Sequence, residues 1–101
     1  MPKGYIIYVE DIKDEAAMGE YAGKAMVSLL QGGGTVAALD DNPDVREGEW
    51  YGNRTVILEF ASVDAARAWY ESADYQAAIP LRQGAADGNV VIVSGFEMPG
   101  A

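Results

Sequence analysis

The sequence contains no histidine and no cysteine. Imidazole is the commonest general base near neutral pH and the usual partner of a catalytic serine, so a Ser-His-Asp triad and a haem held by histidine are both excluded. Without cysteine there can be no disulfide, thiolate metal site or cysteine nucleophile. Zinc would have only carboxylates to bind, and we expect neither a metal nor a cofactor. Any enzyme built from this chain must use Asp, Glu, Tyr, Lys or Arg.

Basic residues are also scarce, with 7 Lys and Arg against 16 Asp and Glu and a formal net charge of -9. Such a surface repels a phosphate backbone, so we expect no nucleic-acid partner. No apolar run approaches the length of a membrane span, and the first residues do not follow the pattern of a secretory leader. From the sequence we expect no membrane association and a cytoplasmic location.

The 101 residues, half of them hydrophobic, suit one packed domain covering residues 1–101. Runs rich in β-branched and aromatic residues predict strands over residues 5–10, 35–39, 54–60 and 89–94. Residues 45–51 are predicted to form a short extended stretch. Apolar residues at helical spacing predict a helix from Glu15 to the glycines at 32–34, and a second over residues 62–72. Ser72 can cap a further helix, which Pro80 is expected to interrupt because proline lacks an amide donor.

Two segments have alternative interpretations. Gly32-Gly33-Gly34 follows a predicted helix and lacks the Gly-Lys-Ser/Thr ending of a phosphate-binding loop, so we interpret it as a helix stop. The cluster Asp40-Asp41-Asn42-Pro43-Asp44 lacks the glycine and the final glutamate of a calcium loop. It is predicted to be a solvated turn.

The predicted order βαββαβ indicates an α+β, ferredoxin-like fold, a four-stranded antiparallel sheet with two helices on one face. The runs at residues 5–9 and 90–93 are apolar on both faces of the pleat, whereas a half-solvated sheet alternates apolar with polar residues. A second copy packed sheet to sheet would cover the open face, so the sequence predicts a homodimer.

One order of residues resembles a known family. It runs from Glu47-Gly48-Glu49-Trp50 through the strand-like residues 54–60 and the helix-like residues 62–72, which carry Trp69-Tyr70, to Tyr75 and Arg82. This spacing resembles the DUF1330 family, and the likeness extends over nearly the whole chain. The resemblance implies a bacterial protein with a dimeric α/β barrel fold and no settled activity. The sequence departs from the family pattern with Ser72-Ala73-Asp74 in place of Ser-Pro-Glu, and with Pro80.

Candidate ligand-pocket residues are few: Arg54, Glu59, Tyr70, Tyr75 and Arg82. Alternation in the strand at residues 54–60 sends Arg54 and Glu59 to opposite faces, so the two should not pair. Glu59 could be a general acid or base in an apolar setting, or a carboxylate paired with an arginine. Tyr75 and Arg82 fall in the segment after the second helix. Arg82 could clamp a small carboxylate or hold the last helix to the sheet.

Two further aromatic positions bear on the candidate pocket. Trp69 and Tyr70 are neighbours about 100° apart on a helix, so one should be core and the other rim, interface or pocket wall. Tyr70 is slightly favoured for the pocket because its hydroxyl needs a partner when buried, although the choice stays open. Trp50 lies outside the regular stripes and is a candidate for the dimer interface.

The sequence leaves three function classes open. The protein could bind a small anionic or aromatic molecule between helices and sheet. It could instead be an enzyme resembling cofactor-independent oxygenases or isomerases, moving a proton with Glu59 or Tyr70. It could also be a dimeric structural module without turnover, because fold alone does not determine function.

Overall fold

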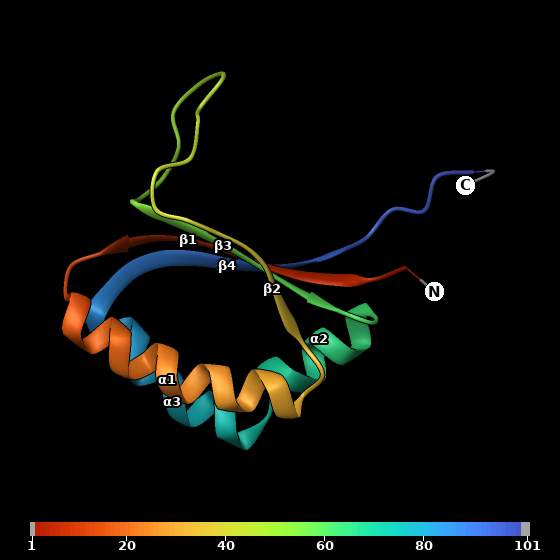
Figure 1. Ribbon diagram of the computed structural model, residues 1–101, viewed down its shortest axis with the longest axis horizontal. Coiled ribbons are helices and arrows are strands. Elements are labelled where there is room, and N and C mark those ends of the chain that lie inside the picture. Colours follow the sequence, from red (N-terminus) through yellow and green to blue (C-terminus); the bar gives the residue numbers. More distant parts are fainter. Residues whose placement is uncertain (1, 100–101) are drawn as a thin grey trace.

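The computed structural model describes residues 2–99 and shows a single sheet with all helices on one of its faces (Figure 1). The elements in chain order are β1 (Gly4–Ile12), α1 (Glu15–Gln31), β2 (Thr35–Asp40), β3 (Arg54–Phe60), α2 (Val63–Tyr70), α3 (Ala73–Ala85) and β4 (Ala86–Ser94). The four strands are antiparallel and lie in the order β2-β3-β1-β4. The predicted α+β, ferredoxin-like class is therefore confirmed, although the described residues form three helices and not the two expected, because residues 73–85 form a separate helix after α2. The sequence-based domain of residues 1–101 includes residues 1, 100 and 101, which lie outside the described part.

Strand β1 is the centre of the sheet and carries the core. Its residues alternate strictly between buried and half-buried, and the buried positions include Ile6, Tyr8, Glu10 and Ile12. This alternation follows from the pleat, which sends every second side chain to the same face. Because helices cover the face that carries Ile6, Tyr8 and Ile12, Glu10 also lies in the core.

Local capping explains where the helices begin and end. Asp14 accepts a hydrogen bond from the amide of Ala17, and Ser62 accepts one from Ala65, which satisfies amide groups that lack partners within each helix. Helix α1 ends at Gln31, and Gly33 then adopts φ 78°, a conformation that glycine tolerates best. The interpretation of the triple glycine as a helix stop is confirmed.

The expected interruption at Pro80 is wrong, because α3 runs through the proline from Ala73 to Ala85. Pro80 is exposed, so the Gln76 carbonyl that lacks its helical partner also lies on the solvent side. A buried stripe from Tyr75 to Ala85 continues on both sides of the proline and packs this helix against α1 and β4. Tertiary packing therefore outweighs the local cost of the proline.

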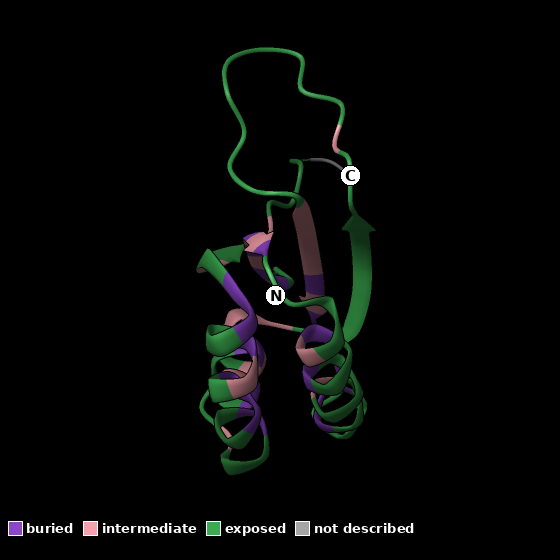
Figure 2. Ribbon diagram, turned by 90° about the vertical axis from the view of Figure 1, so that its left-hand side faces the viewer, coloured by how far each residue is buried: buried purple, intermediate pink, exposed green. Residues whose placement is uncertain are grey.

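The bounds of several elements differ from the predictions by one to three residues, and the change at β4 is the largest. Strand β4 begins at Ala86 and not at residue 89, since Asp87 and Gly88 pair in register with Asp11 and Glu10. Gly88 is required there because a Cβ would lie 2.6 Å from the Val9 carbonyl oxygen. Residues 45–51 form no strand, and the loop between β2 and β3 is almost entirely exposed (Figure 2).

The face of the sheet away from the helices is apolar and open. Tyr5, Ile7, Val9 and Ile57 are half-buried there, and Val91 is 50% exposed. Figure 1 shows no element of the described chain laid over this face. Within residues 2–99, no helix has both the length and the apolar character needed to cross a membrane.

Replacing Pro80 should stabilise the protein, because alanine restores the missing amide donor without removing any buried contact. We expect Pro80→Ala to raise the free energy of unfolding by about 1–3 kcal/mol. Gly84→Ala is a matched control in α3, where an added Cβ meets open space, and it should gain only about 0.5–1 kcal/mol. Denaturant unfolding would measure both, and a loss of stability in Pro80→Ala would contradict the prediction.

Candidate functional site

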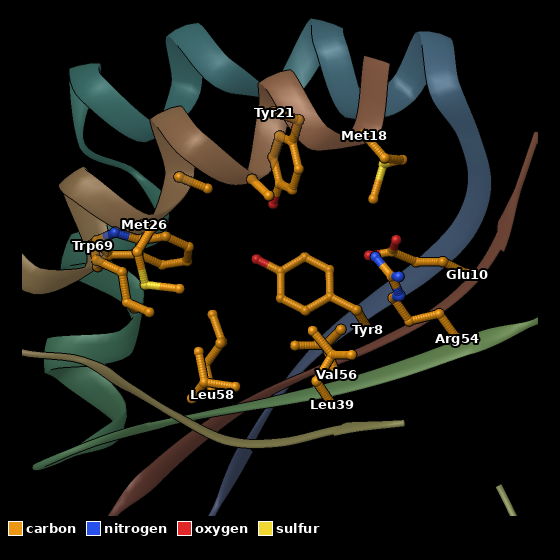
Figure 3. A pocket seen from close by; sticks show the side chains of 14 residues that line it. Tyr8, Glu10, Met18, Tyr21, Met26, Leu39, Arg54, Val56, Leu58 and Trp69 are labelled. Atoms are coloured by element: carbon orange, nitrogen blue, oxygen red, sulfur yellow. The ribbon is translucent and has the colours of Figure 1, made fainter. Parts of the chain in front are cut away.

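A cavity of about 100 Å³ lies between α1 and the strands β2 and β3 (Figure 3). We call it the α1 cavity. Its walls are mainly apolar and include Met18, Leu29, Leu58 and Trp69. Its polar lining residues are Tyr8, Glu10, Tyr21 and Arg54. An apolar cavity with a few convergent polar groups is the usual form of a small-molecule site.

The cavity exists because of how α1 packs. Helix α1 lies mainly against α3, and its small residues Ala22 and Ala25 face the sheet across the cavity. On the opposite wall, Val36 and Leu39 extend from the edge strand β2 and stay largely exposed. The cavity is therefore open toward solvent beside β2.

Glu10 is the most unusual residue of the site. It is 2% exposed, and its Oε2 atom has no hydrogen-bond partner within the described chain. Burial raises the pKa of Glu10, and the positive charges of Arg82 and Arg54 oppose this rise. No ion pair joins Glu10 to either arginine within residues 2–99. A buried acid with a free oxygen and a raised pKa is a candidate functional group.

Arg54, predicted as a pocket residue, lines the cavity beside Glu10. Its guanidinium donates from Nε and Nη2 to the Asp41 carboxylate at the start of the long loop. The hydrogen bond from Arg54 lowers the pKa of Asp41. Arg54 therefore already has a carboxylate partner before any ligand binds.

Tyr75 is fully buried and joins three hydroxyl groups. Its hydroxyl lies 2.8 Å from the Tyr8 hydroxyl and 2.7 Å from the Tyr21 hydroxyl. Burial raises the pKa of Tyr8 and of Tyr21 far above the ordinary range, so both phenols are neutral. Tyr8 and Tyr21 border the cavity, while Tyr75 lies behind them. We call these residues the tyrosine cluster.

Arg82 lies next to this cluster and is 6% exposed. Its Cζ atom is 5.6 Å from the centre of the Tyr8 ring, close enough for a cation–π interaction, and its Nε has no hydrogen-bond partner in the described chain. Arg82 does not line the α1 cavity. With Tyr70 it borders a separate shallow hollow beside β4.

Glu59 lies outside the cavity, on the uncovered face of the sheet. It accepts hydrogen bonds from Lys3 Nζ and from the Tyr5 hydroxyl, each at 3.3 Å. Arg54 and Glu59 are on opposite faces, as the alternation predicts. Trp50 is 52% exposed and donates from Nε1 to Thr55 Oγ1, a residue of the same uncovered face.

Trp69 and Tyr70 differ in how far they are buried and in what they contact. Trp69 is buried and donates from its indole to Ser28 Oγ at 3.1 Å. Tyr70 is half-buried, and its ring centre lies 5.3 Å from that of Tyr75. Trp69 is a core residue that also forms part of the cavity wall, and Tyr70 is a rim residue.

Sequence reasoning missed Tyr8, Glu10 and Tyr21. The signal for Glu10 was present, since alternation places it on the same face as Ile6 and Tyr8 and therefore among core positions. A charged residue in such a row points to a buried functional or paired group. Tyr8 and Tyr21 gave no comparable signal, because aromatic residues are ordinary in a strand and on a helix stripe.

The raised pKa of Glu10 predicts a specific dependence of stability on pH. The folded state holds the Glu10 proton more tightly than the unfolded state, so stability falls as pH rises from the ordinary value of about 4.5 through the folded pKa. The slope is at most about 1.4 kcal/mol per pH unit. Glu10→Gln should lack this fall, so its stability advantage over wild type should grow with pH and then level off.

Denaturant unfolding at a series of pH values upward from the ordinary pKa of about 4.5 measures the effect. Arg54 from β3 and Arg82 from α3 are the charged groups that face Glu10, while α1 offers Met18 and β4 offers Gly88. Glu20→Gln on the exposed side of α1 controls for the loss of one negative charge. If the free energies of unfolding of wild type and Glu10→Gln change with pH in the same way, Glu10 has the same pKa in the folded and unfolded states, and the prediction is wrong.

The fold is shared with several solved structures. A protein of unknown function from Rhodopseudomonas palustris is similar with a TM-score of 0.77 and 16% identity, over 96% of this chain and 85% of that chain. The cofactor-independent oxygenase SnoaB from Streptomyces nogalater gives 0.69 and 8%, over all of both chains. A dimeric protein of unknown function and ferredoxin-like fold from Bacteroides fragilis gives 0.60 and 12%, over 91% of this chain and 95% of that chain. At such identities the similarity shows the fold alone.

Sequence comparison identifies the family. No curated protein matches this chain. The model of a domain of unknown function, DUF1330, matches residues 3–96, which is nearly the whole chain. This agrees with the spacing of aromatic and charged residues described above, and the chain belongs to the DUF1330 family.

Proposed function

We propose that this protein is a homodimer that binds a small, uncharged and mainly apolar or aromatic molecule in the α1 cavity. One observation carries the proposal. Glu10 keeps a carboxylate oxygen without a partner at the wall of an apolar cavity, although burying such a group is costly. A ligand that hydrogen-bonds to Glu10 would offset that cost.

The charges of the cavity favour an uncharged ligand over an anionic one. Arg54 already binds Asp41, and Glu10 would repel a carboxylate when ionised. The overall charge of -9 also disfavours the binding of an anion. Tyr8, Tyr21 and Trp69 instead provide aromatic surface and hydroxyl groups that suit a ring with one polar substituent.

The homodimer is supported by the open face of the sheet. Its apolar side chains include Ile7, Val9, Ile57 and Val91, and patches of this kind mark protein interfaces. Trp50 is held over the same face through Thr55, which supports its proposed place at the dimer interface. The similar protein from Bacteroides fragilis is described as dimeric.

We also propose a bacterial origin and a cytoplasmic location for the protein. The similar structures named above come from bacteria, which supports a bacterial origin. The acidic composition supports a protein that does not bind nucleic acid. The cytoplasmic location stays an expectation from the sequence.

Filling the cavity should abolish ligand binding without unfolding the protein. Ala25 borders the cavity, so Ala25→Phe places a ring in the space that the ligand would use. We expect the Kd for phenol and for cyclohexanone to rise about tenfold or more, which corresponds to about 1.4 kcal/mol. Protein-observed NMR titration measures this change.

Ala16→Phe on the exposed first turn of α1 adds the same ring outside the cavity and should bind both probes like wild type. Unchanged binding in Ala25→Phe would place any ligand elsewhere. If neither probe binds wild type, the role of a structural module without a ligand would be favoured.

A charge on the open face should break the dimer. Two-fold symmetry puts Val91→Glu into the interface twice, so we expect the dimer Kd to rise by about tenfold or more. Val27→Glu is the matched control, because Val27 is 58% exposed on α1, away from the open face. Sedimentation equilibrium of the three proteins tests the proposal, and a wild-type monomer at micromolar concentration would refute it.

A further inference from the structure

We propose that the α1 cavity catalyses proton transfer at a carbon next to a carbonyl group. In this reaction Glu10 takes and returns the proton, and the hydroxyls of Tyr8 and Tyr21 hydrogen-bond to the carbonyl oxygen. The substrate class is a small, uncharged, enolisable ketone or unsaturated ketone. The inference rests on the proposed binding of an uncharged molecule and adds a reaction to it.

Glu10 has the properties of a general base. Its carboxyl group is buried in the apolar wall of the cavity, and Oε2 has no hydrogen-bond partner in the described chain. A raised pKa makes the carboxylate a stronger base than an exposed glutamate. Weakly acidic C–H groups require such a base, which an apolar cavity can provide.

The tyrosine cluster has a hydrogen-bond proton to spare. Three hydroxyls carry three protons, and two hydrogen bonds, through Tyr75, use two of them. If Tyr75 donates to Tyr8, the proton of Tyr8 is free; if it donates to Tyr21, the proton of Tyr21 is free. In a third arrangement both cavity tyrosines donate to Tyr75, and the spare proton is that of Tyr75. Two of the three arrangements thus leave a donor on a residue that lines the cavity.

Arg82 and Tyr75 support these donors from behind. The guanidinium of Arg82 lies over the Tyr8 ring, where its positive charge favours negative charge developing near the hydroxyls. Tyr75 fixes the positions of both cavity hydroxyls through its two short hydrogen bonds. Neither residue lines the cavity, so both are positioning residues.

The base and the donors lie at different ends of one cavity. Figure 3 shows the Tyr8 hydroxyl directed toward Tyr21, while the Glu10 carboxyl lies toward Met18 and Arg54. A ring ketone between them would present its oxygen to the hydroxyls and a C–H group to the carboxylate. The volume of about 100 Å³ is less than the roughly 150 Å³ of a closed cavity that holds benzene, so a ligand with a single ring would extend through the opening beside β2.

The reaction balances without a cofactor. The Glu10 carboxylate removes a proton from the carbon next to the carbonyl, and the electron pair of that C–H bond forms the C=C bond of an enolate. The carbonyl oxygen takes the negative charge and accepts hydrogen bonds from the tyrosines. Glu10 then returns the same proton to the far carbon of the conjugated system, so the product is an isomer and no electron leaves the substrate.

The test uses cyclohex-3-enone, which isomerises to the conjugated cyclohex-2-enone. We expect wild-type protein to accelerate this isomerisation above buffer containing an equal concentration of acetate, with a rate that rises as Glu10 ionises. Glu10→Gln should lower the rate by about 100-fold or more. Tyr8→Phe should lower it by about tenfold to 100-fold, since one oxyanion donor is lost. Glu20→Gln should keep the wild-type rate.

Two further variants distinguish chemistry from folding. Glu10→Asp keeps a carboxyl group and should retain part of the activity that Glu10→Gln loses. Tyr75→Phe changes no lining residue but removes the hydroxyl that positions Tyr8 and Tyr21, so it should lower kcat more than it changes KM. Unfolding curves for each variant show whether it is folded at the assay temperature.

Binding is measured separately by NMR titration with the same ketone. Binding without isomerisation in wild type would overturn the catalytic inference and leave the proposed binding function standing. No binding would overturn both. Isomerisation that survives in Glu10→Gln would refute the role of Glu10 as the base.

Discussion

The Tyr75 hydroxyl holds the two layers of this protein together. Through two short hydrogen bonds it connects α3 to Tyr8 on the central strand and to Tyr21 on α1. Helix α1 makes its main packing contacts with α3 and not with the sheet, so this polar junction fixes how far the helix lies from β2 and β3. The cavity depends on that distance. The two hydrogen bonds of Tyr75 restrict the positions of Tyr8 and Tyr21, which line the cavity, and so give it a defined shape.

Much of the fold could be predicted because its signals are local. Asp14, Ser62 and Ser72 cap helices as their side chains suggest, and strand β3 has the expected bounds. The site was harder to predict because its signals are tertiary. In β3, Val56, Leu58 and Phe60 make the face of Arg54 more apolar than the face of Glu59. Alternation therefore favoured the face that the helices cover, but it could not show where on that face a cavity would remain. The choice of face decides that Arg54 lines the cavity and Glu59 does not.

The same limit explains the other misjudged positions. Whether Pro80 ends a helix depends on which side of that helix meets solvent, and this is known only once α3 is packed. Trp69 and Tyr70 differ by one position on a helix, and the interior location of Trp69 follows from Ser28 on a distant element. Glu10 could have been recognised from alternation alone, whereas its lack of a partner could be seen only in three dimensions.

Arg54 belongs both to the cavity and to the base of the long loop between β2 and β3, because it binds Asp41. The guanidinium of Arg54 therefore interacts electrostatically with two carboxyl groups, those of Asp41 and Glu10. If Asp41 moves away, the arginine charge acts fully on Glu10 and favours its ionised form. By thermodynamic linkage, a protonated Glu10 strengthens the hold of the arginine on the loop. The position of the exposed loop and the protonation of the buried Glu10 are thus coupled through Arg54. No side chain of the loop other than Asp41 needs to take part in this coupling.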